Sequence, residues 1–211
     1  MRNPGGRCRP ATTLVILLGL LTLTGCVQSS KIQTSEPSDV RELSPKLNPF
    51  VFFEDGVLFL GVDSRAAQYV KKGEIFPLGI GLANQSKGTM RFNTESFVLE
   101  TADGQRFPVV TFEEFRNNYN RSQTDARLSD EFQELMRTRF QAYAPPLSWR
   151  PFPASGGTGT SRREVELGRN LWTMAYLYFP IPEEGIHAQE FTLLASPNSS
   201  DETFLVRFKI R

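Results

Sequence analysis

Histidine and cysteine, which supply many catalytic nucleophiles and bases, are scarce in this chain of 211 residues. His187 is the only histidine, and Cys8 and Cys26 are the only cysteines. Catalytic triads need several such groups in one place, and zinc is usually held by sets of cysteine and histidine. We therefore expect no catalytic triad, no metal site and no cofactor, and we interpret His187 as an exposed loop residue.

Acidic side chains are the remaining candidates for chemistry. Glu54-Asp55 and Glu183-Glu184 are adjacent pairs, and Asp63 ends an expected strand. These acids lack the spacing of a calcium loop, and such pairs usually lie in solvated turns. The run Gly156-Gly157-Thr158-Gly159-Thr160 lacks the Lys-Ser/Thr ending of a phosphate-binding loop, so it predicts a surface loop. These features favour a protein that is not an enzyme.

The N-terminus has the pattern of an export signal. Arg2, Arg7 and Arg9 precede an apolar stretch of 13 residues from Ala11 to Leu23. A helix of that length spans roughly 20 Å, less than the roughly 30 Å hydrocarbon core of a bilayer. The stretch therefore predicts a signal peptide over residues 1–25 rather than a transmembrane helix.

The signal ends in Leu23-Thr24-Gly25-Cys26, which resembles the lipobox of bacterial lipoprotein precursors. The resemblance implies that residues 1–25 are removed and that Cys26 is acylated on sulfur, giving a palmitate-type membrane anchor. Because Val27 rather than aspartate follows Cys26, it also favours the periplasmic side of the outer membrane. The alternative is an ordinary secretory signal followed by a cysteine of no special role.

Removal of residues 1–25 leaves a mature chain with little net charge. The discarded segment contains Cys8, three arginines and no acidic residue, so 21 basic and 23 acidic residues remain, for a net charge of −2. Such a chain lacks the basic surface that nucleic-acid binding requires, and we expect no nucleic-acid partner. Residues 26–47 are polar and proline-containing and predict a lipidated flexible tether, which leaves residues 48–211 for one domain.

Alternation of apolar and polar residues predicts strands through most of residues 48–211. Between Phe76 and Ala83, large residues alternate with small ones, so we expect a second layer to pack on the small face formed by Gly79, Gly81 and Ala83. Pro77 predicts that this strand is an edge strand or carries a bulge. Further strands are expected at residues 96–100, 105–110, 164–167, 171–179, 189–195 and 204–210.

Two local patterns refine the expected sheet arrangement. Ala102-Asp103-Gly104 contains the Asp-Gly pair that is typical of a hairpin turn. The segment from Phe50 to Leu60 is too apolar for a strand with one wet face. We expect it either to be covered on both sides or to meet a partner in part.

A helical period replaces the alternation within an insertion at about residues 113–144. Leu128, Phe132, Leu135, Met136 and Phe140 recur on one helix face, which we call the apolar stripe. Ser129 is the expected N-cap, and a shorter helix is expected near residues 112–119, before a polar break at 117–124. The stripe must be buried, either on the sheet or against a protein partner.

Three groups of residues carry a second resemblance: Leu82-Ala83-Asn84, Phe97-Val98-Leu99 with Asp103-Gly104, and Tyr176-Leu177-Tyr178-Phe179-Pro180. The pattern resembles the immunoglobulin-like lipoproteins of unknown function in bacterial envelopes. It implies a mainly β protein, an immunoglobulin-like antiparallel β-sandwich with a helical insertion, and it brings no mechanism.

Two functions fit this sequence. The first is a membrane-anchored envelope lipoprotein whose β-sandwich is a non-catalytic binding module. The alternative is a structural or accessory subunit of an envelope secretion or transport assembly, in which the helix docks onto an envelope protein partner. Co-purification would distinguish a monomer from a stoichiometric assembly.

Overall fold

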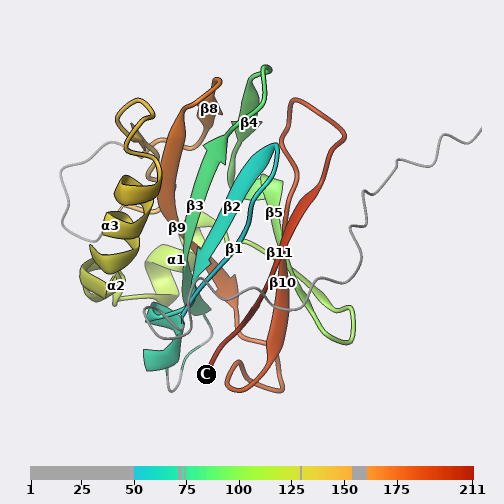
Figure 1. Ribbon diagram of the computed structural model, residues 1–211. Helices are drawn as coiled ribbons and strands as arrows, with labels where there is room; N and C mark the ends of the chain where they lie inside the picture. The colour runs from blue at the N-terminus through green and yellow to red at the C-terminus, as the bar shows by residue number, and fades with distance from the viewer. Residues whose placement is uncertain (1–49, 71–72, 74, 129, 154–160) are drawn as a thin grey trace, which may run out of the picture.

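The computed structural model describes residues 50–70, 73, 75–128, 130–153 and 161–211 (Figure 1). The signal peptide, Cys26 and the tether over residues 26–47 lie outside the described residues, as do Ser129 and the glycine-rich run at 156–160. None of the helices in the described part of the chain is long and apolar enough to cross a membrane.

The described residues are mainly β and form three sheets. The five-stranded sheet has the order β1-β2-β3-β9-β7, the four-stranded sheet β11-β10-β5-β6, and a small sheet pairs β4 with β8. All pairs are antiparallel except β7 with β9. The strands are β1 (Val51–Glu54), β2 (Leu58–Asp63), β3 (Ile75–Asn84), β4 (Met90–Phe92), β5 (Phe97–Thr101), β6 (Arg106–Pro108), β7 (Leu147–Ser148), β8 (Val165–Leu167), β9 (Trp172–Pro180), β10 (Glu190–Ala195) and β11 (Phe204–Lys209).

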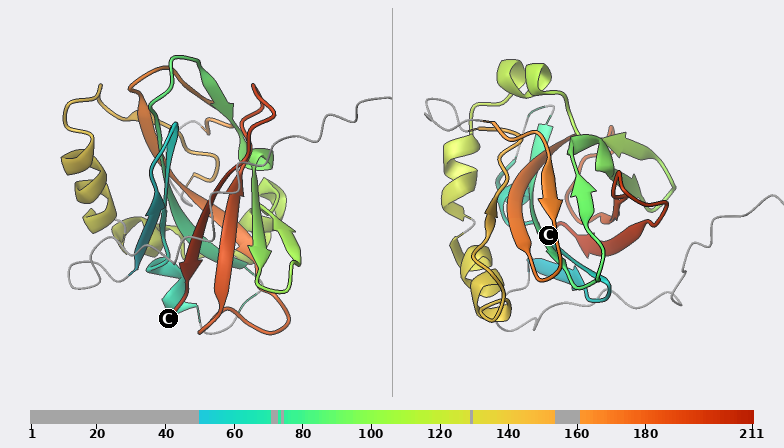
Figure 2. Two further views of the ribbon diagram at one scale, coloured as in Figure 1. Left: turned by 45° about the vertical axis from the view of Figure 1, so that its right-hand side comes forward. Right: turned by 90° about the horizontal axis from the view of Figure 1, so that it is seen from above.

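The two larger sheets enclose the main apolar core between them (Figure 2). Rings from the five-stranded sheet meet rings from the other, with centroids 6.2 Å apart for Phe52 and Phe208 and for Phe76 and Phe191. Burying a phenylalanine contributes roughly 1.5–3 kcal/mol, so these rings account for much of the attraction between the sheets. The expected strands and the mainly β, antiparallel character are confirmed.

The apolar run at residues 50–60 forms two strands of one hairpin. β1 and β2 pair around a turn at residues 55–57, and every residue of β2 is buried. Leu58, Leu60 and Val62 face the core between the sheets, whereas Phe59 lies in a second apolar cluster under the helices. The strands of this run are therefore covered on both sides. This confirms the first of the two arrangements expected from the sequence.

β3 corrects the expectation for Pro77. The strand is central in its sheet, flanked by β2 and β9. β2 ends at Asp63, opposite Gly79, so Pro77 lies beyond its end. On the other side, the carbonyl of Tyr178, which is opposite Pro77, accepts a hydrogen bond from the Val110 N–H and so points away from β3. Neither β2 nor β9 therefore presents a carbonyl that would require a backbone N–H from residue 77. This is why a central strand accommodates a proline here.

The insertion contains three α-helices rather than two. They are α1 (Phe112–Asn118), α2 (Ser122–Leu128) and α3 (Asp130–Arg139). Two short 3-10 helices lie outside the insertion, η1 (Ala66–Tyr69) between β2 and β3 and η2 (Thr94–Ser96) between β4 and β5. The polar break predicted over residues 117–124 is confirmed but is shorter, because α1 ends at Asn118 and α2 begins at Ser122. The buried residues of α2 are Ser122 and Asp125, both polar, so it has no apolar period to detect.

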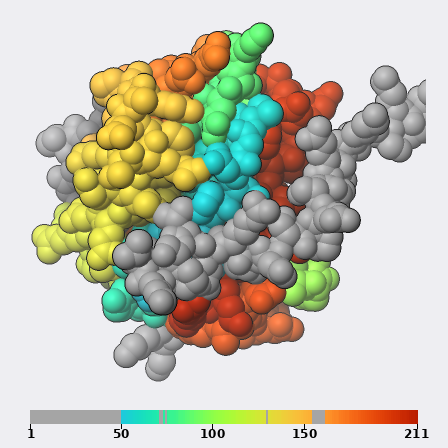
Figure 3. All heavy atoms as spheres, in the orientation of Figure 1, coloured from blue at the N-terminus to red at the C-terminus, as the bar shows by residue number. Residues whose placement is uncertain are grey.

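The apolar stripe was predicted on one helix, but Leu128 is the last residue of α2, whereas Phe132, Leu135 and Met136 lie on α3. The helices lie on the outer face of the five-stranded sheet, on the side away from the four-stranded sheet (Figures 1 and 2). Phe132, Met136 and Phe140 are buried there, whereas Leu128 and Leu135 are half-buried. The β1–β2 hairpin lies beside the helical insertion on the surface (Figure 3). At the tip of the hairpin, Asp55 forms an ion pair with Arg139 of α3. Of the two uses that the sequence left open for the stripe, the structure shows packing on the sheet.

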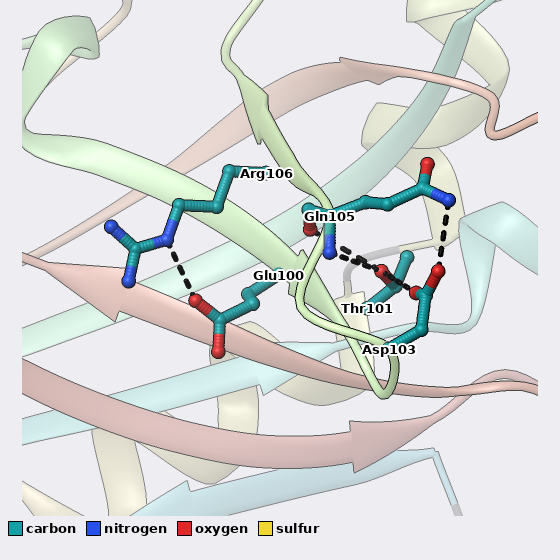
Figure 4. A network of polar contacts seen from close by, with 5 residues as sticks. All are labelled: Glu100, Thr101, Asp103, Gln105 and Arg106. Atoms are coloured by element: carbon teal, nitrogen blue, oxygen red, sulfur yellow. Dashed lines mark hydrogen bonds and ion pairs between the residues drawn. The ribbon is translucent and has the colours of Figure 1, made fainter.

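The β5–β6 hairpin confirms the turn predicted at Asp103-Gly104 (Figure 4). The Thr101 hydroxyl and the Gln105 amide, the latter at 2.8 Å, both donate to the Asp103 carboxylate. These hydrogen bonds hold the pKa of Asp103 below its usual value. Gly104 has a φ of +85°, a conformation that glycine adopts at little cost.

Gly104→Ala should therefore lower the free energy of unfolding by about 1 kcal/mol, the cost of a left-handed conformation for a residue with a Cβ. Nothing within 4 Å would clash with that Cβ, so the effect is one of backbone conformation. Gly56→Ala is the control, because it adds a Cβ to equally open space without a positive φ. Urea unfolding of both variants tests this, and equal midpoints would contradict it.

Candidate functional site

A groove of about 520 Å³ lies between the helices and the five-stranded sheet. One wall is formed by α2 and α3, the floor by β3 and β9, and the other wall by the irregular segment 146–153, which includes β7. Its volume is within the range of small-molecule sites. Figure 2 shows the helices on one side of β9. β7, which follows the helices in the chain, pairs with β9.

Six aromatic residues lie around the groove, and all of them except Tyr176 are buried. β9 places alternate residues on its helix-side face, so Tyr176 and Tyr178 join Trp172 there, while Leu177 and Phe179 face the main core. The segment 146–153 adds Trp149 and Phe152, and α3 adds Phe132. The chain contains only two tryptophans, and both line this groove.

Neighbouring contacts hold these rings in place. The Tyr178 ring packs among Phe115, Tyr119 and Phe152, with centroid distances of 4.5, 4.8 and 5.2 Å. The indole Nε1–H of Trp172 donates to the Ala144 carbonyl at 2.8 Å. These buried rings fix the shape of the groove but offer little surface to a ligand.

The charged residues that line the groove are both arginines, Arg137 from α3 and Arg150 from the 146–153 segment. Both are exposed at the surface. Among the described residues, no aspartate or glutamate lines the groove. Glu134 lies 4.0 Å from Arg137, a distance at which the attraction between exposed groups is weak. The groove therefore presents a positive rim above a floor in which Met174 and Tyr176 are half-buried.

The buried carboxyl of Asp125 lies near the groove but does not line it. Asp125 of α2 accepts a hydrogen bond from the Tyr119 hydroxyl at 2.5 Å, and its backbone carbonyl accepts one from Tyr176 at 2.5 Å. Burial raises the pKa of Asp125 to about 6, although the Tyr119 hydrogen bond acts in the opposite direction. Because Asp125 has no exposed surface, it can position Tyr176 but cannot reach a ligand in solvent.

Asp63 is the one acid singled out from the sequence that proves to be buried. Its Oδ1 accepts a hydrogen bond from the Arg65 backbone N–H at 2.9 Å, and its Oδ2 has no partner among the described residues. Burial raises its pKa to about 6, while the nearby Arg65 lowers it. The Arg65 guanidinium itself pairs with Glu131 of α3 at 3.0 Å.

The other residues considered for chemistry lie apart from the groove. His187 is exposed, and its Nε2 lies 3.2 Å from the Val70 carbonyl. Glu183 and Glu184 are exposed in a turn, and Asp55 is the partner of Arg139. No cluster of three potential metal ligands occurs in the part of the chain that the structure describes. Of the apolar stripe, Phe132 alone lines the groove.

Sequence reasoning missed the tryptophans and the two arginines of the groove. A signal was present in the segment Pro145-Pro146-Leu147-Ser148-Trp149-Arg150-Pro151-Phe152-Pro153, where four prolines alternate with aromatic and basic residues. Such a segment has no strand or helix period, yet its prolines restrict the backbone and its aromatic residues need burial.

Comparison with known proteins adds little. No family model and no curated protein matches the chain. Two solved structures from Bacillus subtilis show a weak similarity. The "putative lipoprotein" ycdA is 10% identical with a TM-score of 0.38, and the match covers 74% of this chain but 38% of that one. The yjhA protein is 14% identical with a TM-score of 0.38, covering 75% of this chain and 95% of that one. Neither similarity is strong enough to establish fold or function.

Proposed function

We propose that this protein is a membrane-anchored envelope lipoprotein whose β-rich domain is a non-catalytic binding module, with the groove as its binding site. The groove supports the binding part of the proposal, because two helices, the sheet and the 146–153 segment enclose about 520 Å³ beside two exposed arginines, Arg137 and Arg150. The anchoring part rests on the lipobox-like Leu23-Thr24-Gly25-Cys26, which places the domain at residues 48–211 beyond a tether. An immunoglobulin-like sandwich with a helical insertion is the finer fold description that we propose.

The absence of a catalytic role is also part of the proposal. Asp63 and Asp125 are the described carboxyls with raised pKa values, and both are buried beneath helices and unable to contact a substrate. His187 lies outside the groove, and its neighbours supply no second catalytic group. A groove lined by rings and arginines can bind and orient a molecule, but these residues supply no base or nucleophile.

The alternative role, an accessory subunit of an envelope secretion or transport assembly, has less support. It was expected to use the apolar stripe as a docking surface, and Phe132, Met136 and Phe140 are occupied by the sheet. Purification after mild solubilisation separates the two roles. A monomer supports the binding module, whereas a stoichiometric complex that persists through purification supports the assembly subunit.

Cys26→Ser should move the protein from the membrane fraction to the soluble fraction. The proposed lipid is attached to the Cys26 sulfur. One acyl chain gives only marginal membrane binding, whereas two or three chains anchor a protein firmly. The mature chain, at a net charge of −2, gains nothing from anionic lipids. Fractionation followed by immunoblotting measures the distribution.

Cys8→Ser is the matched control, because Cys8 is the only other cysteine and lies within the proposed signal peptide. It should leave the protein in the membrane pellet. A Cys26→Ser protein that stays in the pellet after a high-salt wash would refute lipid anchoring, and with it the outer-membrane location on the periplasmic side that we propose.

A further inference from the structure

We propose that Arg65 is a pH-dependent clamp on the corner between α2 and α3, which holds the two helices while Asp63 is protonated and releases them when Asp63 ionises. Three observations carry this proposal. They are the contacts of Arg65 with both helices, the buried carboxyl beside it, and the charges that act on that carboxyl. The proposal goes beyond the binding function and does not depend on what the groove binds.

Arg65 joins the segment after β2 to both helices. Its Nη1 donates to the Leu128 carbonyl at 3.3 Å, and Leu128 is the last residue of α2. Its Nη2 lies 3.0 Å from the Glu131 carboxylate, in the first turn of α3. A cation near the last carbonyls of a helix is favourable, because those carbonyls have no partner within the helix. Since α2 and α3 form one wall of the groove, these contacts hold that wall at its corner.

The Asp63 carboxyl lies beside the clamp on the helix side of the sheet. A Cβ at Gly79 would lie 3.2 Å from the Asp63 Cβ and 3.6 Å from the Phe132 ring of α3. Asp63 is buried, its Oδ1 accepts the Arg65 backbone N–H, and its Oδ2 has no partner within the described part of the chain. A neutral carboxyl tolerates such a site, whereas a buried carboxylate requires a cation or further hydrogen bonds.

Two charged groups act on the Asp63 carboxyl, Arg65 on its own segment and Glu131 on α3. Its strand neighbours Val51 and Gly79 carry no charge. Burial raises the pKa of Asp63 to about 6, the backbone hydrogen bond and charge of Arg65 act against this rise, and the charge of Glu131 adds to it.

Ionisation of Asp63 leaves one guanidinium between two carboxylates. The Arg65 side chain is 12% exposed, whereas that of Glu131 is 71% exposed and is solvated by water without the arginine. The buried Asp63 carboxylate therefore gains more from Arg65 than Glu131 does, because attraction between charges is stronger away from water. Arg65 turns from the helices to Asp63, and the corner loses both of its contacts.

Double-mutant cycles measure this change of partner, because they isolate the coupling of two side chains from the overall stability. The protein is the mature chain, residues 26–211 with Cys26→Ser. The substitutions are Arg65→Gln, Glu131→Gln and Asp63→Asn, made singly, in pairs and together. Urea unfolding gives the unfolding constant of each variant at pH 5.0 and pH 7.5, below and above the pKa of Asp63.

At pH 5.0, Arg65 and Glu131 should be coupled by about threefold in the unfolding constant, as expected for a partly buried ion pair. At pH 7.5 this coupling should disappear, and Arg65 and Asp63 should become coupled by roughly tenfold, since one of these partners is buried. Asp63→Asn carries no charge at either pH, so the coupling between Arg65 and Glu131 should persist at pH 7.5 in that background.

The matched control is the ion pair between Arg91 of β4 and Glu166 of β8, whose Nε and Oε2 atoms are 3.2 Å apart. A cycle of Arg91→Gln and Glu166→Gln should give the same coupling at both pH values. A change in this pair equal to the change in the clamp would assign the effect to pH in general and would contradict the proposal.

Three other results would overturn it. The first is a coupling between Arg65 and Glu131 that is absent at pH 5.0 or equal at both pH values. The second is a loss of that coupling at pH 7.5 that Asp63→Asn does not prevent. The third is the absence of coupling between Arg65 and Asp63 at pH 7.5. None of these results would alter the membrane fractionation of Cys26→Ser, so failure of the clamp is distinguishable from failure of the proposed function.

Discussion

Phe132→Ala should lower the free energy of unfolding by about 3–5 kcal/mol, the range for truncating a buried phenylalanine. The Phe132 ring lies over three glycines, Gly61, Gly79 and Gly81. Gly61 of β2 and Gly81 of β3 are paired across the two strands. A Cβ at Gly81 would lie 3.0 Å from the ring and 2.7 Å from Met136 Cε. The contact is therefore between a ring and bare backbone, and alanine cannot restore it.

The matched control is Leu135→Ala on the same helix. Leu135 is half-buried, so its truncation should cost about 1 kcal/mol. Because the groove beside Phe132 lets solvent into the space left by the ring, we expect a value near 3 kcal/mol rather than 5 for Phe132→Ala. Urea unfolding measures both. A midpoint that does not move with Phe132→Ala would mean that α3 leaves the sheet in solution and is free to meet a partner.

This contact shows how far periodicity predicts the fold. The alternation of large and small residues along β3 indicated that another layer lies close to Gly79, Gly81 and Ala83, and the 3–4 spacing of Phe132, Met136 and Phe140 indicated an apolar helix face. The small face of β3 leaves room for a close neighbour, and the apolar helix face must be buried against another surface. Packing one against the other satisfies both, and the structure shows this arrangement.

Elements held by polar or long-range contacts were predicted less well. Helix α2 buries Ser122 and Asp125, so its inner face looks like an exposed one in the sequence. Pro77 indicated an edge, but its place in the sheet depends on where β2 ends, which local sequence does not determine. β4, which pairs with β8, has three residues and no pattern of its own. In each case the position of the element depends on contacts with residues that are distant in the sequence.

The groove could not be assembled from the sequence for the same reason. Its rings come from α3, the irregular 146–153 segment and β9, and no repeat connects Phe132 to Trp149 or Trp172. The prediction of few catalytic groups drew attention to what the chain lacks, and away from the aromatic and arginine side chains that line the groove. The residue types were visible, but their convergence is a property of the tertiary structure.

Stability should fall as the pH rises from about 4 to about 6, because of Asp63. Burial raises the pKa of this carboxyl from 3.8 to about 6. Between these values the folded protein binds the proton and the unfolded chain releases it, so the folded state binds more protons and the free energy of unfolding decreases as the pH increases. Above both pKa values the loss is complete, and it amounts to about 3 kcal/mol at 1.36 kcal/mol for each pKa unit.

Asp63→Asn should remove this part of the pH dependence and raise the free energy of unfolding at pH 7.5 by about 1–3 kcal/mol. Asparagine keeps the Oδ1 that accepts the Arg65 N–H, and it carries no charge to leave buried at Oδ2. The gain is reduced by the lost attraction to the Arg65 guanidinium. A smaller slope should persist, since burial also raises the pKa of Asp125 to about 6.

Asp103→Asn is the control of opposite sign. The hydrogen bonds from Thr101 and Gln105 lower the pKa of Asp103, so its contribution to stability is present above the unfolded pKa and is lost on acidification. This variant should therefore be less stable than the parent at pH 7.5 and should keep the fall between pH 4 and 6. Urea midpoints across pH 4.0–7.5 for the three proteins decide the matter. Parallel profiles for the parent and Asp63→Asn would show that the Asp63 carboxyl is ionised in the folded protein at pH 4, and that water or a rearranged Arg65 reaches its Oδ2.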